Sequence, residues 1–105
     1  MEFIETSTFT KRIRDLLNDE DYRALQNELV LDPTQGDLIR GTHGLRKLRA
    51  SQGDRGKRGG LRSWYFHATA RDIIFLLFVL PKNKASDLTK QMEQQLAALV
   101  RKEFP

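Results

Sequence analysis

The richest group of residues able to do chemistry on an anion lies in one short segment, from Gly41 to Arg62. Its sequence, GTHGLRKLRASQGDRGKRGGLR, contains seven Lys or Arg residues and a single carboxylate, Asp54. Ammonium and guanidinium groups bind phosphate oxygens and stabilise the negative charge that develops on a reacting phosphate. Because one carboxylate cannot neutralise all these cations, the segment predicts a site for a polyphosphate chain.

The rest of the chain does not share this charge. Residues 1–40 carry a formal charge of −4, residues 41–62 carry +6 and residues 63–105 carry +2, within a net charge of +4. The basicity is therefore concentrated in one segment, which favours a directed anionic partner over a generally basic surface.

Other chemistries have less support in the sequence. The glycines of the segment match neither the GxxxxGK[ST] pattern nor a GxGxxG turn between a strand and a helix. No His, Asp and Glu residues have metal-ligand spacing, so a metal nuclease is not expected and no cofactor is predicted. His43 and His67 are isolated, and a lone histidine is more often structural than catalytic. A merely solvated basic loop stays open as an alternative.

The length of 105 residues suits one domain with a modest core, and we expect a single domain over residues 1–105. The chain has no cysteine, which excludes disulfides and cysteine-based zinc sites. The N-terminus MEFIETSTF lacks the charged and then apolar pattern of a signal peptide. The longest apolar run, residues 73–80, is too short to span a bilayer. We therefore expect a cytoplasmic protein without a membrane partner.

Two amphipathic helices are predicted after a short first strand in MEFIET, in which Phe3 points inward. The segment STFTKRIRDLL offers Ser7 or Thr8 as an N-cap, and NDEDYRALQNELVLDP offers Asn18 or Asp19. Apolar side chains recur at helical spacing in both segments, as Phe9, Ile13, Leu16 and Leu17 and then as Tyr22, Leu25 and Leu29. The two helices are expected to form a helical hairpin.

Three strands and a last helix are predicted in the second half. The strands are LRKLR, GLRSWYFHAT and DIIFLLFVL, and the last of these is apolar on both faces, as in a central covered strand. Ser86 is expected to cap the helix SDLTKQMEQQLAALVRKEF. Helices at both ends and strands between them predict an α+β domain with an antiparallel sheet.

The predicted strands bring the cations together. Alternation in LRKLR places Leu48 on one face of the sheet and Lys47 and Arg49 on the other. The glycine-rich stretch from Ala50 to Gly60 reads as a hairpin connection, so Arg62 lies on the neighbouring strand.

The order of these elements resembles the RelE/HigB toxins of bacterial type II toxin–antitoxin systems, within the RelE/ParE superfamily. The similarity covers essentially the whole chain, and its most specific pieces, GLRKLR…GKRGGLR and PKNKASDLT, resemble the HigB branch. The resemblance implies a microbial-ribonuclease-like fold, with helices packed on one face of an antiparallel sheet and a basic concave surface opposite.

The resemblance also implies an activity. Such toxins enter the A site of the 30S ribosomal subunit, beside rRNA, and cut mRNA during translation without a metal. The ribose 2′-hydroxyl attacks its own phosphate and gives a cyclic phosphate and a free 5′-hydroxyl. A cognate antitoxin, often with a helix-turn-helix domain, is the implied inhibitor, and operator DNA is bound only through that antitoxin.

Four residues match the family's catalytic basic set. The resemblance implies proton transfer for Lys47, phosphate contact for Arg49, a hold on the scissile phosphate for Arg62 and an additional cation at Lys82. A lysine crowded by other cations loses its proton more readily, which suits the first role. The further residues expected to contact RNA are Arg46, Arg55, Lys57, Arg58, Tyr65, His67 and Lys84.

The sequence departs from the family pattern at two positions. Asn83 stands where many relatives have arginine, and Thr89 stands where a catalytic tyrosine often lies. The general acid that protonates the leaving oxygen is therefore not identified, and Tyr65 or His67 are the substitutes considered.

Two other functions stay open at the level of sequence. One is a ParE-like toxin that binds DNA gyrase and is not an enzyme, although such toxins tend to lack the catalytic basic set. The other is a non-toxic module that binds RNA or the ribosome in a salt-sensitive way.

Overall fold

The computed structural model describes residues 1–51, 60–82 and 87–105. Several residues singled out in the sequence lie outside these ranges and are not placed: Arg55, Lys57, Arg58, Asn83, Lys84 and Ser86.

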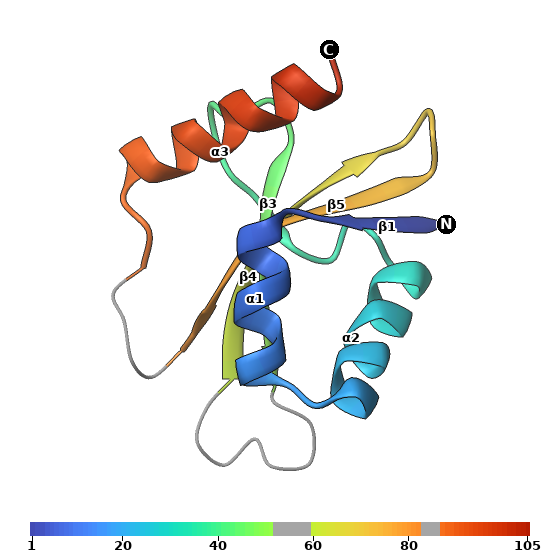
Figure 1. Ribbon diagram of the computed structural model, residues 1–105. Coiled ribbons are helices and arrows are strands. Elements are labelled where there is room, and N and C mark those ends of the chain that lie inside the picture. Colours follow the sequence, from blue (N-terminus) through green and yellow to red (C-terminus); the bar gives the residue numbers. More distant parts are fainter. Residues whose placement is uncertain (52–59, 83–86) are drawn as a thin grey trace.

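Eight elements make up the described chain (Figure 1). They are β1 (Glu2–Glu5), α1 (Ser7–Leu16), α2 (Asp19–Leu31), β2 (Asp37–Leu38), β3 (Leu45–Ser51), β4 (Gly60–Ala68), β5 (Ile73–Pro81) and α3 (Lys90–Glu103). The predicted α+β class is confirmed, as are the first strand, the two N-terminal helices and the three later strands.

The strands form one sheet in the order β1-β5-β4-β3-β2. The predicted antiparallel arrangement holds for β2 to β5, but β1 pairs parallel with β5. A parallel pair needs a long crossover connection, and the chain between β1 and β5 supplies both helices and three strands. β5 thereby lies inside the sheet and is buried on both faces, as its apolar run predicted.

The N-terminal helices α1 and α2 pack on one face of the sheet (Figure 1). Phe9 and Ile13 from α1 and Leu25 and Leu29 from α2 join a core cluster that includes Leu48 of β3. Burial of apolar side chains of this size contributes about 1.5–3 kcal/mol for each residue, so this layer stabilises the packing of both helices on the sheet.

The start of α1 differs by one residue from the prediction. Thr6 is the N-cap, instead of Ser7 or Thr8, because its hydroxyl accepts a hydrogen bond from the Phe9 N–H at 3.0 Å. The same hydroxyl donates to the carbonyl of Leu77 at 2.7 Å, so the cap also joins α1 to β5. The predicted cap of α2 is confirmed, since the Asn18 side chain accepts from the Asp21 N–H at 2.7 Å.

A polar contact ties the first strand to both helices. The Glu5 carboxylate accepts hydrogen bonds from the Thr10 hydroxyl of α1, at 2.5 Å, and from the Tyr22 hydroxyl of α2. Burial, the hydrogen bond to Glu5 and the charge of Glu5 together raise the pKa of Tyr22 well above its usual value.

Replacing Tyr22 by phenylalanine is expected to lower the free energy of unfolding by about 1.5 kcal/mol, because a hydrogen bond to a charged group is lost.

The stability of the wild-type protein should also depend on pH through Tyr22. Above about pH 10 the unfolded tyrosine ionises while the folded one keeps its proton, so the free energy of unfolding of the wild type must fall as pH rises. This alkaline loss should be smaller in Tyr22→Phe. Urea unfolding of both proteins at about pH 8 and about pH 11 measures the difference. Tyr65 also has a pKa raised by burial, but it contributes to both proteins. Equal alkaline losses in the two would contradict the assignment.

The C-terminal helix α3 packs on the opposite face of the sheet. Ala97 and Val100 are its buried residues, and Val100 joins a second core cluster with Leu45, Trp64 and Phe75. The family resemblance implied that the helices pack on one face of the sheet. The structure instead places α1 and α2 on one face and α3 on the other. The alternation of the strands explains this, because each inner strand presents apolar side chains to both faces.

The predicted start of α3 at Ser86 is wrong. The helix begins at Lys90, and its N-cap is Thr89, whose hydroxyl accepts from the Met92 N–H at 3.1 Å. Leu88 precedes the helix and packs against the second core cluster without being helical. Among the helices described here, none has the length and apolar character needed to cross a membrane.

Candidate nucleic-acid interface

Strands β3 and β4 place three cations on one face of the sheet. Lys47 lies opposite Trp64, and Arg49 lies opposite Arg62, in the antiparallel register of the two strands. Paired residues share a face, and side chains two apart along a strand do too. Lys47, Arg49 and Arg62 therefore lie together beside Trp64, on the face that α3 partly covers. We call the side of the sheet that carries these three side chains the cationic face.

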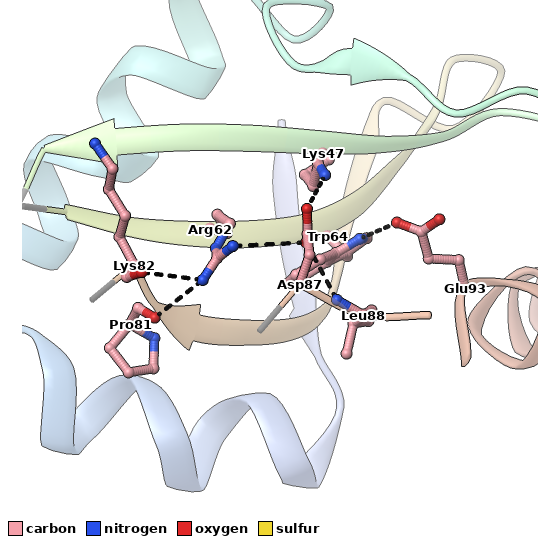
Figure 2. A network of polar contacts seen from close by, with 8 residues as sticks. All are labelled: Lys47, Arg62, Trp64, Pro81, Lys82, Asp87, Leu88 and Glu93. Atoms are coloured by element: carbon pink, nitrogen blue, oxygen red, sulfur yellow. Dashed lines mark hydrogen bonds and ion pairs between the residues drawn. The ribbon is translucent and has the colours of Figure 1, made fainter. Parts of the chain in front are cut away.

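Arg62 is held in place by the end of the neighbouring strand. Its Nη2 donates to the carbonyl of Lys82 at 3.1 Å and more weakly to that of Pro81 at 3.4 Å (Figure 2). The side chain is only 12% exposed, so the guanidinium is fixed in direction. A guanidinium held in this way directs Nη1 toward the Asp87 carboxylate, so Nη1 is the nitrogen placed to contact an anion.

Lys47 is fixed between a carboxylate and an aromatic ring. Its Nζ lies 2.6 Å from Oδ2 of Asp87 and 5.9 Å from the centroid of the Trp64 ring. Trp64 is fully buried, and its Nε1 donates to the Glu93 carboxylate of α3 at 2.9 Å (Figure 2). The C-terminal helix thus positions Lys47 indirectly, through the indole ring.

Asp87 was not predicted from the sequence as part of the site. Its Oδ1 lies 3.9 Å from Nη1 of Arg62 and also accepts from the Leu88 N–H at 3.1 Å. Burial raises the pKa of the Asp87 carboxyl, but the hydrogen bond and charge of Lys47 and the charge of Arg62 outweigh burial and lower it below the usual value. Asp87 is therefore ionised at neutral pH, which makes it a poor proton donor.

The remaining members of the proposed catalytic set are solvent-exposed. Arg49 projects from β3 on the cationic face, and Lys82 follows the end of β5. The backbone N–H of Lys82 donates to the Gly60 carbonyl at 2.8 Å, so it remains aligned with the start of β4. Both side chains can reach an extended ligand lying along this end of the sheet.

Arg46 and Tyr65 do not belong to this site. They lie opposite one another on the other face, where the Arg46 guanidinium donates to the carbonyl of Gly36 at 2.8 Å and to that of Thr34 at 3.1 Å. Tyr65 is fully buried, with its hydroxyl donating to the Pro33 carbonyl at 2.7 Å and accepting from the Gly36 N–H at 3.0 Å. A Cβ on Gly36 would lie 2.8 Å from this ring, so glycine is required there. The expectation that Tyr65 stacks on a base does not fit this packing.

His67 is also separated from the cationic face. It pairs with Ile74 at the other end of β4, and its Nε2 lies 4.0 Å from Oδ1 of Asp72. Both ring nitrogens are buried without a hydrogen-bond partner among the described residues. Neither His67 nor Tyr65 is therefore placed to protonate a leaving oxygen near Arg62.

Thr89, one of the two positions that depart from the pattern of the family the sequence resembles, has a structural role as the N-cap of α3. Within residues 1–51, 60–82 and 87–105, no three His, Asp or Glu side chains gather where they could hold a metal ion.

Arg12 extends the positive charge to the edge of the sheet and was not predicted. From α1, its Nε donates to the Val79 carbonyl at 2.8 Å, and its guanidinium lies 4.8 Å from the centroid of the Phe78 ring. Phe78 lies opposite Trp64 and so shares the cationic face. The helical position of Arg12, next to the buried stripe of Phe9 and Ile13, was the available signal.

Comparison with solved structures identifies the fold. No family model matches the sequence. The structure is similar to that of an E. coli RelE toxin, a double arginine-to-alanine mutant solved in the free state. The TM-score is 0.59, and the match covers 95% of each chain at 19% sequence identity. The chain has the RelE fold. At this identity the likeness establishes the fold alone.

Proposed function

We propose that this protein is the toxin of a bacterial type II toxin–antitoxin pair, of the HigB type, and cuts mRNA on the ribosome. The observation that carries the proposal is the convergence of Lys47, Arg49 and Arg62 on one face of a RelE-like sheet. A gyrase inhibitor that is not an enzyme has no evident need for this arrangement.

The chemistry assigned to the site is an internal displacement at phosphorus. The 2′-oxygen of one nucleotide forms a bond to its own 3′-phosphorus, and the bond from phosphorus to the 5′-oxygen of the next nucleotide breaks. Arg62, with Arg49 beside it, stabilises the added negative charge on the phosphate oxygens. Lys47 takes the proton of the 2′-hydroxyl, once the lysine is neutral and separated from Asp87. No protein group among the described residues is assigned to protonate the leaving 5′-oxygen, so water supplies this proton in the proposed step.

A site without an assigned general acid depends on positioning. Holding the 2′-oxygen, the phosphorus and the leaving oxygen in line can supply several kcal/mol, up to about 7–11 kcal/mol in model reactions. The ribosomal A site is proposed to hold the mRNA in this way, so cleavage is expected to require translation. Cleavage of free RNA is expected to be weak.

The proposed partners follow from the same charges. An antitoxin that presents an acidic segment to Lys47, Arg49 and Arg62 would compete directly with mRNA. A helix-turn-helix domain and operator binding belong to the antitoxin in this proposal, and the cytoplasm is the compartment in which both partners and the ribosome occur.

Inducible expression in bacteria tests the function. We expect growth arrest together with new 5′ ends on translated mRNA, mapped by primer extension, and no such ends on an untranslated copy of the same transcript. Growth arrest with a DNA-damage response and intact mRNA would instead identify a gyrase inhibitor. Salt-sensitive RNA binding without arrest would identify a non-toxic binding module.

A further inference from the structure

The cationic face already holds an anion, and that anion belongs to the protein. Asp87 hydrogen-bonds Lys47 through Oδ2 at 2.6 Å, while its Oδ1 lies 3.9 Å from Arg62 (Figure 2). The carboxylate comes from the segment before α3, whereas the two cations come from β3 and β4. The hydrogen bond from the Leu88 N–H further fixes its direction.

A carboxylate in this position imitates part of a phosphate. Both groups present negatively charged oxygens to ammonium and guanidinium donors at similar distances. Lys47 and Arg62 cannot keep these contacts and also bind a phosphate at the same place. An ammonium group that hydrogen-bonds a carboxylate also cannot accept a proton from a 2′-hydroxyl.

We propose that Asp87 is an internal competitor of the RNA phosphate. Its carboxylate occupies Lys47 and Arg62 until an RNA chain displaces it. The identity of the ligand as RNA rests on the proposed function. The competition itself depends only on the three side chains and their contacts.

The contact is suited to being displaced. The Asp87 side chain is 39% exposed, so solvent and salt screen its attraction to the cations. A single phosphate gains little over the carboxylate that it replaces. An extended strand also reaches the exposed side chains of Arg49 and Lys82 and releases counterions along its length. Asp87 therefore makes the site selective for a polynucleotide over free nucleotides and inorganic phosphate.

Binding of an uncleavable RNA tests the competition. The probe is a fluorescein-labelled single-stranded oligonucleotide with 2′-O-methyl groups throughout, followed by anisotropy at low salt. Asp87→Asn removes the charge and keeps an oxygen that can accept from the Leu88 N–H. We expect it to bind the probe about threefold to tenfold more tightly than wild type. The slope of log affinity against log salt should be steeper by roughly 0.7 for each cation released.

Asp15→Asn is the matched control. Asp15 is exposed on α1, so the substitution changes net charge by the same amount without touching the cationic face. We expect its affinity to stay within about twofold of wild type, since a remote surface charge is screened. Inorganic phosphate should compete better for Asp87→Asn than for wild type.

Binding by Asp87→Asn that is equal to or weaker than that of Asp15→Asn would overturn the proposal, as would an absence of binding in both. If Asp87→Asn does not fold, the same binding measurement is made with Asp87→Ser, which also keeps an acceptor oxygen. The assay contains no ribosome and no cleavable bond. A wild-type protein that fails to cut mRNA would therefore contradict the proposed function, whereas the competition by Asp87 is decided by the binding assay alone.

Discussion

Arg62→Gln is expected to slow mRNA cleavage in a reconstituted translation reaction by about 100-fold to 1,000-fold. Removal of one preorganised donor to a developing oxyanion has an effect of this size in other enzymes. Arg62 is the most firmly positioned of the cations, since its guanidinium is nearly buried and donates to the carbonyl of Lys82. The measurement is the single-turnover rate of appearance of the cut, with the toxin in excess over ribosomes.

Arg23→Gln is the control for this loss of charge. Arg23 is exposed on α2, away from the cationic face, and Arg and Gln have similar helix propensities. Arg62→Lys should fall between wild type and Arg62→Gln, because it keeps the charge and loses the planar fork. If Arg62→Gln folds normally and cuts at about the wild-type rate, Arg62 does not act on the phosphate.

Trp64→Ala is expected to lower the free energy of unfolding by about 3–5 kcal/mol. The ring is fully buried in the second core cluster, and its Nε1 donates to the Glu93 carboxylate of α3. Removing it leaves a cavity under α3 and an unpaired carboxylate beside it. Because a domain of this size has a total stability of about 5–15 kcal/mol, much of the variant should be unfolded at growth temperature.

Urea unfolding followed by far-ultraviolet circular dichroism measures this loss, since the chain has a single tryptophan and the variant has none. Trp64→Phe should lose less, because it keeps a ring and gives up the hydrogen bond. Met92→Ala on α3 is the control, as Met92 is 44% exposed, and about 0.5 kcal/mol or less is expected. A loss below about 1 kcal/mol for Trp64→Ala would show that α3 does not depend on this ring.

The sequence was sufficient to place the cations because their positions depend on local alternation. LRKLR is short and regular, so Lys47 and Arg49 had to share a face opposite to Leu48. The same rule, applied more strictly, would have removed three other candidates. Arg46 is one residue from Lys47 in the strand, and Tyr65 and His67 are an odd number of residues from Arg62, so they belong to the other face.

The contacts of Asp87 could not be predicted in this way. They depend on a contact between distant parts of the chain, since Lys47 and Asp87 are 40 positions apart in the sequence. Leu88 packs against the second core cluster, which includes Trp64, and no local pattern encodes this long-range contact. The parallel pairing of β1 was hidden for the same reason, because it joins residues about 70 positions apart, such as Glu2 and Ile73.

The chemistry of the cut ends tests the central claim most directly. In a translation reaction, an mRNA with a single 2′-deoxy nucleotide at the mapped cut position is compared with the all-ribose mRNA. Attack by the 2′-oxygen predicts a 2′,3′-cyclic phosphate and a 5′-hydroxyl from the ribose mRNA, and no cut at the deoxy position. Continued cutting of the deoxy mRNA, or ends that carry a 5′-phosphate, would contradict the assignment of Lys47, Arg49 and Arg62 to this reaction.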